Sequence, residues 1–267
     1  HLDRENMRIG SRVANDEYEK ESYGDFALWK AWEESDGDVA WDSPWGKGRP
    51  GWHIECSAMS MKYLGETFDL HTGGIDNLFP HHENEIAQAE GATGKLFVKT
   101  WMHCAHLRVN GEKMSKSLGN FFTLRDLLQK GYTGREIRYV LISGQYRQPL
   151  NFTFDAMNAA RTALGRVDEC VDHLTEKAGS VEASDAPAWA DAALKSFADA
   201  VNDDLNLPEA FAALFELVRQ ANSALREPGF TPAAAAAALG TFNKMDSVLG
   251  LIHFGRTPKE ADLPPDI

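Results

Sequence analysis

Glu112–Asn120 reads EKMSKSLGN, and this stretch does most to decide the fold and chemistry of the chain. Two lysines, two serines and a glycine on one short loop are groups that interact with phosphate. Lysine ammoniums are mobile point charges, and hydroxyls and loop amides donate hydrogen bonds to phosphate oxygens. A solvated turn has a similar composition, so the stretch predicts a phosphate site only together with its surroundings.

The residues around this loop alternate between two kinds of pattern. Short apolar runs, such as 96–98, are interspersed with helical spacing at 57–64, 83–92 and 124–130. Strands that alternate with helices predict one half of an α/β sheet.

After Pro149 the sequence is helical almost throughout. Apolar residues recur at three- and four-residue spacing with few β-branched interruptions, which predicts amphipathic helices at 156–174, 188–201, 208–225 and 232–251. Thr231 is the expected N-cap of the last helix, because Pro232 suits the first helical position. A helical bundle attached to half of an α/β domain is therefore the expected architecture.

Composition limits the class of protein. The chain has 267 residues, a net charge of −13 and three cysteines. We expect a cytoplasmic protein with no membrane span and no disulfide framework, because no apolar run is long enough to cross a membrane and the cysteines are few and odd in number. Residues 101–150 carry a net charge of +5 within this acidic chain, which is a weak indication of a basic face for RNA.

A second group of residues suggests a metal site. His81 and Glu85 are four residues apart and share a face if this segment is helical, and Cys56 adds a thiolate. This set of donor atoms suits Zn²⁺ better than Mg²⁺ or Ca²⁺. Helix capping by the histidines and core packing by the cysteine would explain the same residues. A rival ligand group at His103, Cys104 and His106 fits a strand at least as well.

Several long motifs resemble the cysteinyl-tRNA synthetase family of class I aminoacyl-tRNA synthetases. The similarity is carried by the stretches GRPGWHIECSAM at 48–59, FPHHENEIAQ at 79–88, WMH at 101–103, KMSKS at 113–117, NFFT at 120–123, PLNF at 149–152 and NLPEA at 206–210.

This resemblance implies a fold and a division of the chain. The fold is α/β: a partial Rossmann-like class I catalytic domain followed by an all-α helical bundle. Residues 1–50 would be the end of a connective insertion. Residues 51–150 would form the second half of the catalytic domain, and residues 151–267 a bundle that contacts tRNA.

The resemblance also implies an activity and its substrates. A cysteine–tRNA ligase activates cysteine with ATP and Mg²⁺ and transfers it to tRNA(Cys), and a monomer is expected. Zn²⁺ would be held by Cys56, His81 and Glu85 and would bind the substrate thiolate, which distinguishes cysteine from serine. Trp52 would form an aromatic wall beside the amino acid, and His71 would lie near its carboxylate.

The ATP-binding residues follow from the same resemblance. Catalysis would depend on Lys116 and Lys113, with Ser115 and Ser117 among the ATP-binding groups of the loop. The stretch HTGGID at 71–76 resembles a nucleoside-binding loop in which Gly74 allows close approach and Asp76 accepts hydrogen bonds from ribose. Thr72 replaces the usual glycine of this loop.

One part of the family pattern is not found. The sequence contains no His-x-Gly-His motif and only three matches to the four zinc ligands, so we expect the chain alone to be inactive. Two alternatives remain open at this point. One is a non-catalytic paralogue or fragment that binds tRNA or a partner, and the other is a related cysteine ligase that acts on an amino sugar.

Overall fold

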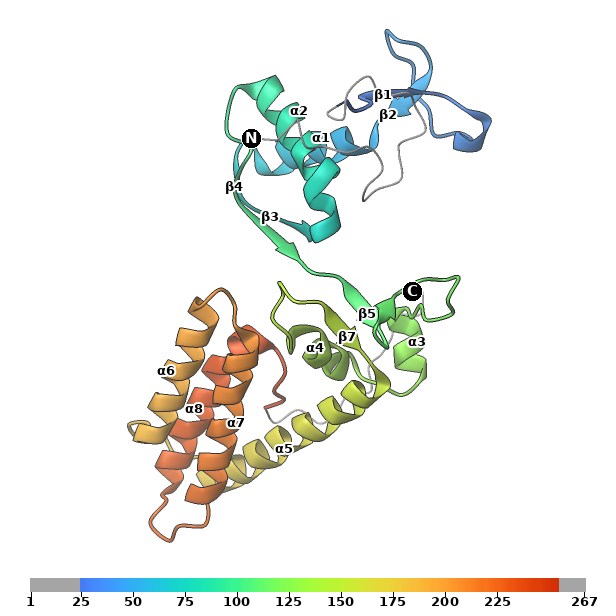
Figure 1. The fold of residues 1–267 in the computed structure, drawn as a ribbon. Coiled ribbons are helices and arrows are strands. Elements are labelled where there is room, and N and C mark those ends of the chain that lie inside the picture. Colours follow the sequence, from blue (N-terminus) through green and yellow to red (C-terminus); the bar gives the residue numbers. More distant parts are fainter. Residues whose placement is uncertain (1–24, 255–267) are drawn as a thin grey trace. The chain divides into compact units, whose positions relative to one another are not determined.

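The computed structural model describes residues 25–254, which form two compact units that divide after Cys104. No helix in this range is long and apolar enough to cross a membrane. Each unit is described by itself below, with the element labels of Figure 1.

The first unit combines a small hairpin with a strand-helix-strand element. Strands β1 (Trp29–Ala31) and β2 (Gly48–Pro50) pair antiparallel, and α1 (Trp52–Leu64) follows directly. Strands β3 (Phe68–Gly74) and β4 (Val98–Cys104) pair in parallel and are connected through α2 (Glu83–Thr93). Parallel strands need such a crossover. The crossover between β3 and β4 also includes two short helical turns, Ile75–Asn77 and Leu78–His82, which precede α2.

The second unit begins with a three-stranded sheet. Its central strand β5 (Leu107–Val109) pairs antiparallel with β6 (Glu112–Lys113) and parallel with β7 (Leu150–Phe152). Helices α3 (Leu124–Gln129) and α4 (Gly134–Ile142) lie between β6 and β7 in the sequence and form the crossover. The loop that follows β6 contains the lysine-rich stretch, so the sheet fixes where this loop begins.

Four long helices complete the second unit: α5 (Phe154–Ala178), α6 (Ala188–Asn202), α7 (Leu207–Ala224) and α8 (Pro232–Leu249). Helices α6, α7 and α8 pack together, and α5 extends from the sheet region to contact α7 and α8 (Figure 1). Their shared core is made of fully buried apolar side chains, among them Leu174, Leu214, Leu217, Phe242 and Met245.

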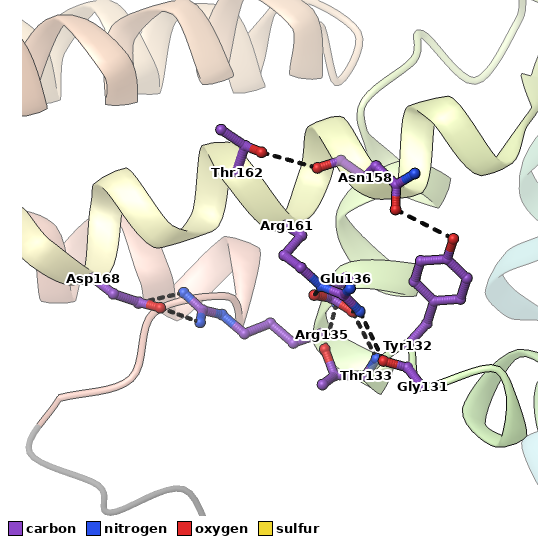
Figure 2. Close-up of polar contacts among 9 residues, drawn as sticks. All are labelled: Gly131, Tyr132, Thr133, Arg135, Glu136, Asn158, Arg161, Thr162 and Asp168. Carbon is purple, nitrogen blue, oxygen red and sulfur yellow. Dashed lines mark hydrogen bonds and ion pairs between the residues drawn. The ribbon is translucent and has the colours of Figure 1, made fainter.

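Charged side chains join α4 to α5 (Figure 2). Arg135 of α4 donates two hydrogen bonds to the carboxylate of Asp168 on α5, at 2.6 and 2.5 Å. Arg161 of α5 donates to both carboxylate oxygens of Glu136 on α4, at 2.6 and 3.2 Å. Paired guanidinium and carboxylate groups give directional contacts, so α5 is held to the sheet region in one orientation.

The α/β architecture followed by a helical bundle is confirmed. Helices are found at every segment where the apolar spacing predicts one, with ends that differ by a few residues. The predicted cap is also found, because the hydroxyl of Thr231 accepts a hydrogen bond from the Ala234 amide at 3.2 Å. The expected domain limits at residues 50 and 150 remain predictions, and both ends of the chain, 1–24 and 255–267, lie outside the described residues.

Candidate metal centre and lysine loop

Three side chains of the first unit converge on one point. Cys56 comes from α1, His81 from the turn before α2, and Glu85 from the first turn of α2. One ligand atom from each, a sulfur, a nitrogen and an oxygen, lies within 4.8 Å of the other two. We call these three residues the metal cluster. The crossover between β3 and β4 brings α2 beside α1 and so joins residues that are far apart in the sequence.

The carboxylate of Glu85 is the unusual member of the metal cluster. Its side chain is 0% exposed, and burial raises its pKa, although a hydrogen bond from His71 opposes this shift. Oε1 of Glu85 lies 2.8 Å from Nε2 of His81 without hydrogen-bond geometry. This oxygen has no hydrogen-bond partner among residues 25–254. A buried carboxylate oxygen without a partner is costly, and a cation would satisfy it.

The other two members of the metal cluster also suit a cation. Burial, together with the neighbouring His53 and His71, lowers the pKa of His81 to about 4. Its imidazole is therefore neutral at pH 7 and keeps a lone pair for a metal. Burial first, and then the carboxylates of Glu85 and Glu55, raise the pKa of the Cys56 thiol. A divalent cation would reverse that effect, because a coordinating thiol is deprotonated. The residues present therefore fit Zn²⁺.

Further histidines surround the metal cluster, and sequence reasoning assigned no place in the site to His53 or His82. His53 Nδ1 lies 2.8 Å from His81 Nδ1, and His82 Nδ1 lies 2.7 Å from His103 Nε2. Burial and neighbouring histidines lower the pKa of His82 to about 4. The adjacent pair at 81 and 82 was a signal for this network. His53 carried none, and His103 was predicted only as part of the rival ligand group, because the contacts of both depend on the tertiary fold.

Trp52 and His71, the two predicted substrate contacts, both lie beside this network. The Trp52 ring stacks on His81 with centroids 4.4 Å apart, while the tryptophan remains 55% exposed. His71 stacks on Trp101 at 4.6 Å, and its Nε2 donates a hydrogen bond to Glu85 Oε2 at 2.7 Å. His71 therefore contacts a residue of the metal cluster directly, a position that the sequence did not indicate.

The glycines at the end of β3 make room for polar neighbours. A Cβ atom at Gly73 would lie 2.5 Å from the His82 ring, and one at Gly74 would lie 2.4 Å from the Asp76 carboxylate. Both distances are shorter than side chains tolerate, so any other residue would displace His82 or Asp76. Packing against Asp76 therefore requires a glycine at position 74, independently of its predicted role in the approach of a nucleoside.

The rival ligand group is not assembled. His103 and Cys104 end strand β4, as the strand interpretation predicted, and the Cys104 thiol contacts the Gly73 carbonyl at 3.4 Å. Within residues 25–254, neither Cys104 nor His106 belongs to a group of three side chains close enough to share an ion. All three cysteines are free thiols.

The lysine loop, Lys113–Ser117, lies in the second unit, and its form depends on Asn120. The Asn120 side chain accepts a hydrogen bond from the Ser115 amide at 2.7 Å and donates one to the Lys113 carbonyl at 3.1 Å. Ser115 and Ser117 share a hydroxyl hydrogen bond at 2.7 Å. Lys113 and Lys116 are exposed, and the Lys116 ammonium lies 5.5 Å from the centroid of the Phe121 ring. The loop backbone is held while its ammonium groups face solvent.

Comparison with known proteins identifies the class to which these features belong. The family described as “tRNA synthetases class I (C) catalytic domain” matches residues 2–162, and the “DALR domain” family matches residues 196–253. The LeuRS chain in a ternary complex of Agrobacterium radiobacter K84 agnB2 LeuRS with tRNA and LeuAMS has a similar fold, with a TM-score of 0.60 and 16% identity. That similarity covers 78% of this chain and 32% of the LeuRS chain. The fold and motifs define a class I tRNA synthetase.

The relatives narrow this class to one amino acid. The cysteine–tRNA ligase of Protochlamydia amoebophila (strain UWE25) is 46% identical over 270 residues, which cover 100% of this chain and 56% of the relative. That of Chlamydia pneumoniae is 48% identical over 256 residues, which cover 94% of this chain and 54% of the relative. The chain belongs to the cysteine–tRNA ligase family and spans about half the length of the curated relatives it matches.

Proposed function

We propose that this chain carries the cysteine-selecting part and the lysine loop of a cysteine–tRNA ligase. The observation that carries the proposal is the convergence of Cys56, His81 and Glu85 around a buried carboxylate oxygen that has no hydrogen-bond partner among residues 25–254. Family membership supplies the reaction class, ATP-dependent activation of cysteine followed by transfer to tRNA(Cys).

The metal cluster would select the amino acid. When bound, Zn²⁺ supplies a Lewis acid that prefers a thiolate to a hydroxyl. Cysteine and serine differ only in this group, which is a thiol in cysteine and a hydroxyl in serine. Three ligands from this chain would leave the fourth position of a four-coordinate zinc ion open. Trp52 lies against His81 with an exposed face, which suits an aromatic wall beside the substrate.

The lysine loop would act on the phosphates of ATP, bound with Mg²⁺. A carboxylate oxygen of cysteine attacks the α-phosphorus, a new oxygen–phosphorus bond forms, and pyrophosphate leaves with the electrons of the broken bond. Lys116 foremost, and Lys113 second, would stabilise the negative charge that develops on the phosphates. Ser115 and Ser117 would donate hydrogen bonds to the same oxygens.

The remaining assignments also belong to this proposal. Gly74 and Asp76 would contact the nucleoside, and His71 would lie close enough to the metal cluster to contact the amino acid. The helices from α5 onward would bind tRNA(Cys). The protein would act in the cytoplasm as a monomer, with its catalytic part ending near residue 150.

The test is cysteine-dependent exchange of pyrophosphate into ATP. The reaction requires a complete catalytic domain, so the chain is joined to the amino-terminal half from a relative. We expect Lys116→Ala to lower the exchange rate by about 10²- to 10³-fold, the effect of removing one group that stabilises developing charge. Lys244→Ala, at an exposed lysine of α8, is the matched control.

Two results would contradict the proposal. Exchange that survives Lys116→Ala would remove the role given to the loop. Ligation of cysteine to an amino sugar, without charging of tRNA(Cys), would favour the related cysteine ligase instead.

A further inference from the structure

We propose that His71 and His53 are positioning residues that hold Glu85 and His81 in the orientation required for metal binding. This inference rests on the proposed metal site. It assigns a role to two histidines that would not themselves bind the ion. The argument comes from how each ligand uses its two polar atoms.

Glu85 uses its two oxygens differently. Oε2 accepts a hydrogen bond from His71 Nε2 at 2.7 Å, whereas Oε1 faces Nε2 of His81 at 2.8 Å without hydrogen-bond geometry. The bond to Oε2 restricts rotation of the carboxylate and leaves Oε1 directed at the centre of the metal cluster. His71 is held in turn on β3, where its ring stacks on Trp101.

His81 shows the same division between its two nitrogens. Nε2 faces Glu85, and Nδ1 lies 2.8 Å from Nδ1 of His53. Two imidazole nitrogens at this distance share one proton. If Nε2 of His81 gives its lone pair to a metal, Nδ1 must carry the proton and donate it to His53. His53 Nδ1 is placed to accept that proton, so the contact is compatible with the tautomer of His81 that binds a metal.

The positions of the two histidines in the fold support this arrangement. His53 precedes Cys56 by three residues on α1, so the helix presents a ligand and the partner of another ligand on one face. His71 reaches Glu85 from β3. Loss of a residue that orients a metal ligand through a hydrogen bond typically weakens metal affinity by about 10- to 100-fold.

A different interpretation gives the same histidines a second ion. Nitrogens of His71 and His82 and an oxygen of Glu85 lie within 4.8 Å of one another. The hydrogen bond from His71 Nε2 to Glu85 places a proton where that ion would need a lone pair. The observed bond therefore favours positioning of one site over a second site.

The experiment measures metal binding by the chain itself, with Zn²⁺ and Co²⁺ as probes. We expect one ion per chain, and a rise of about 10- to 100-fold in the zinc dissociation constant for His71→Ala and for His53→Ala. The cobalt absorption bands should shift in both variants. His71→Gln and His53→Asn keep a polar atom near the position of the lost nitrogen, so they should restore most of the affinity.

The control is His103→Ala, which removes a histidine of the same network that contacts His82 and no member of the metal cluster. Its zinc affinity should match that of the unaltered chain, and thermal unfolding of the metal-free variants shows whether each one is folded. Unchanged affinity in both alanine variants would overturn the inference. Two ions per chain, reduced to one by His71→Ala, would overturn it in favour of a second site. Failure of the unaltered chain to bind zinc would instead overturn the proposed metal site.

Discussion

The metal cluster and the lysine loop are both built to handle charge, but the protein treats them in opposite ways. Glu85 and His81 are buried, and His71 and His53 lie at hydrogen-bond distance from their side chains. Lys113 and Lys116 are exposed, and the hydrogen bonds of the loop hold its backbone and its serine hydroxyls. A metal ligand gains from being fixed in a desolvated position before the ion arrives, because each ligand atom must meet the ion within a few tenths of an ångström.

The lysine loop, which we propose acts on phosphates, has a different requirement. The charge on a triphosphate changes position during the reaction, and a lysine on a flexible stem can follow it. Hydrogen bonds thus restrain the ligand side chains in the metal cluster, whereas in the lysine loop they restrain the backbone and leave the lysine side chains free to move. The predictions below test the metal cluster, the packing and ion pairs of the second unit, and the lysine loop, in order of decreasing expected effect.

The largest effect is expected from removing a buried ligand. Cys56→Ser should lower zinc affinity by more than about 100-fold. Substitution of a residue that only orients a metal ligand already lowers metal affinity by up to about this factor. Cys104→Ser is the matched control, because that thiol lies outside the metal cluster. Zinc content after dialysis measures both. Equal zinc content in the two variants would show that the cysteine ligand was assigned wrongly.

The next effect tests the core that supports the lysine loop. Met157 of α5 is fully buried with Val109 and Phe152 of the adjacent strands. Met157→Ala should lower the free energy of unfolding of the second unit by about 2–5 kcal/mol, the usual cost of such a cavity. Zinc content should not change. Leu141→Ala, at an exposed position of α4, is the control for loss of a similar side chain.

A smaller, pH-dependent effect is expected at Glu136 (Figure 2). Burial acts to raise its pKa, but hydrogen bonds from Arg161 and Thr133 outweigh burial and lower it below the ordinary value of 4.5. A lowered pKa in the folded state stabilises the protein above pH 4.5, and this contribution is lost as the pH falls towards the folded-state pKa.

Glu136→Gln should therefore destabilise the protein by roughly 1 kcal/mol at pH 7, since Arg161 is half-exposed and solvent screens the pair. The difference from the unaltered chain should shrink on acidification below pH 4.5. Chemical denaturation at several pH values measures it, with Glu169→Gln on the exposed face of α5 as the control. A difference that grows on acidification would show that the sign is wrong.

The smallest effect concerns the lysine loop itself. Asn120→Ala removes two hydrogen bonds that hold the loop backbone. The bond from the Ser115 amide contributes about 0.5–1 kcal/mol, so hydrogen exchange of this amide should accelerate by roughly 2- to 5-fold. Zinc affinity should stay unchanged. Asn243→Ala on α8 is the control, and an unchanged exchange rate at Ser115 would mean that Asn120 does not hold the loop.

Particular residues show how far the sequence alone reaches. Periodic apolar spacing was sufficient for the helices, and a threonine followed by proline was sufficient for the start of α8, because helix formation depends on neighbours within four residues. The spacing of His81 and Glu85 placed both on one side of a turn for the same reason. The long motifs indicated the family, and the comparisons confirm it.

The tertiary structure decided what lies around those residues. His53 and His81 are 28 positions apart, and His82 and His103 are 21 apart, yet each pair meets at hydrogen-bond distance. The pairing of Arg161 with Glu136 likewise depends on how α5 packs against α4. These contacts depend on how α1, α2, β3 and β4, and further along α4 and α5, fold against one another. Local spacing determined which side chains could bind a metal or a phosphate, whereas packing of distant segments decided which of them are buried, oriented and paired.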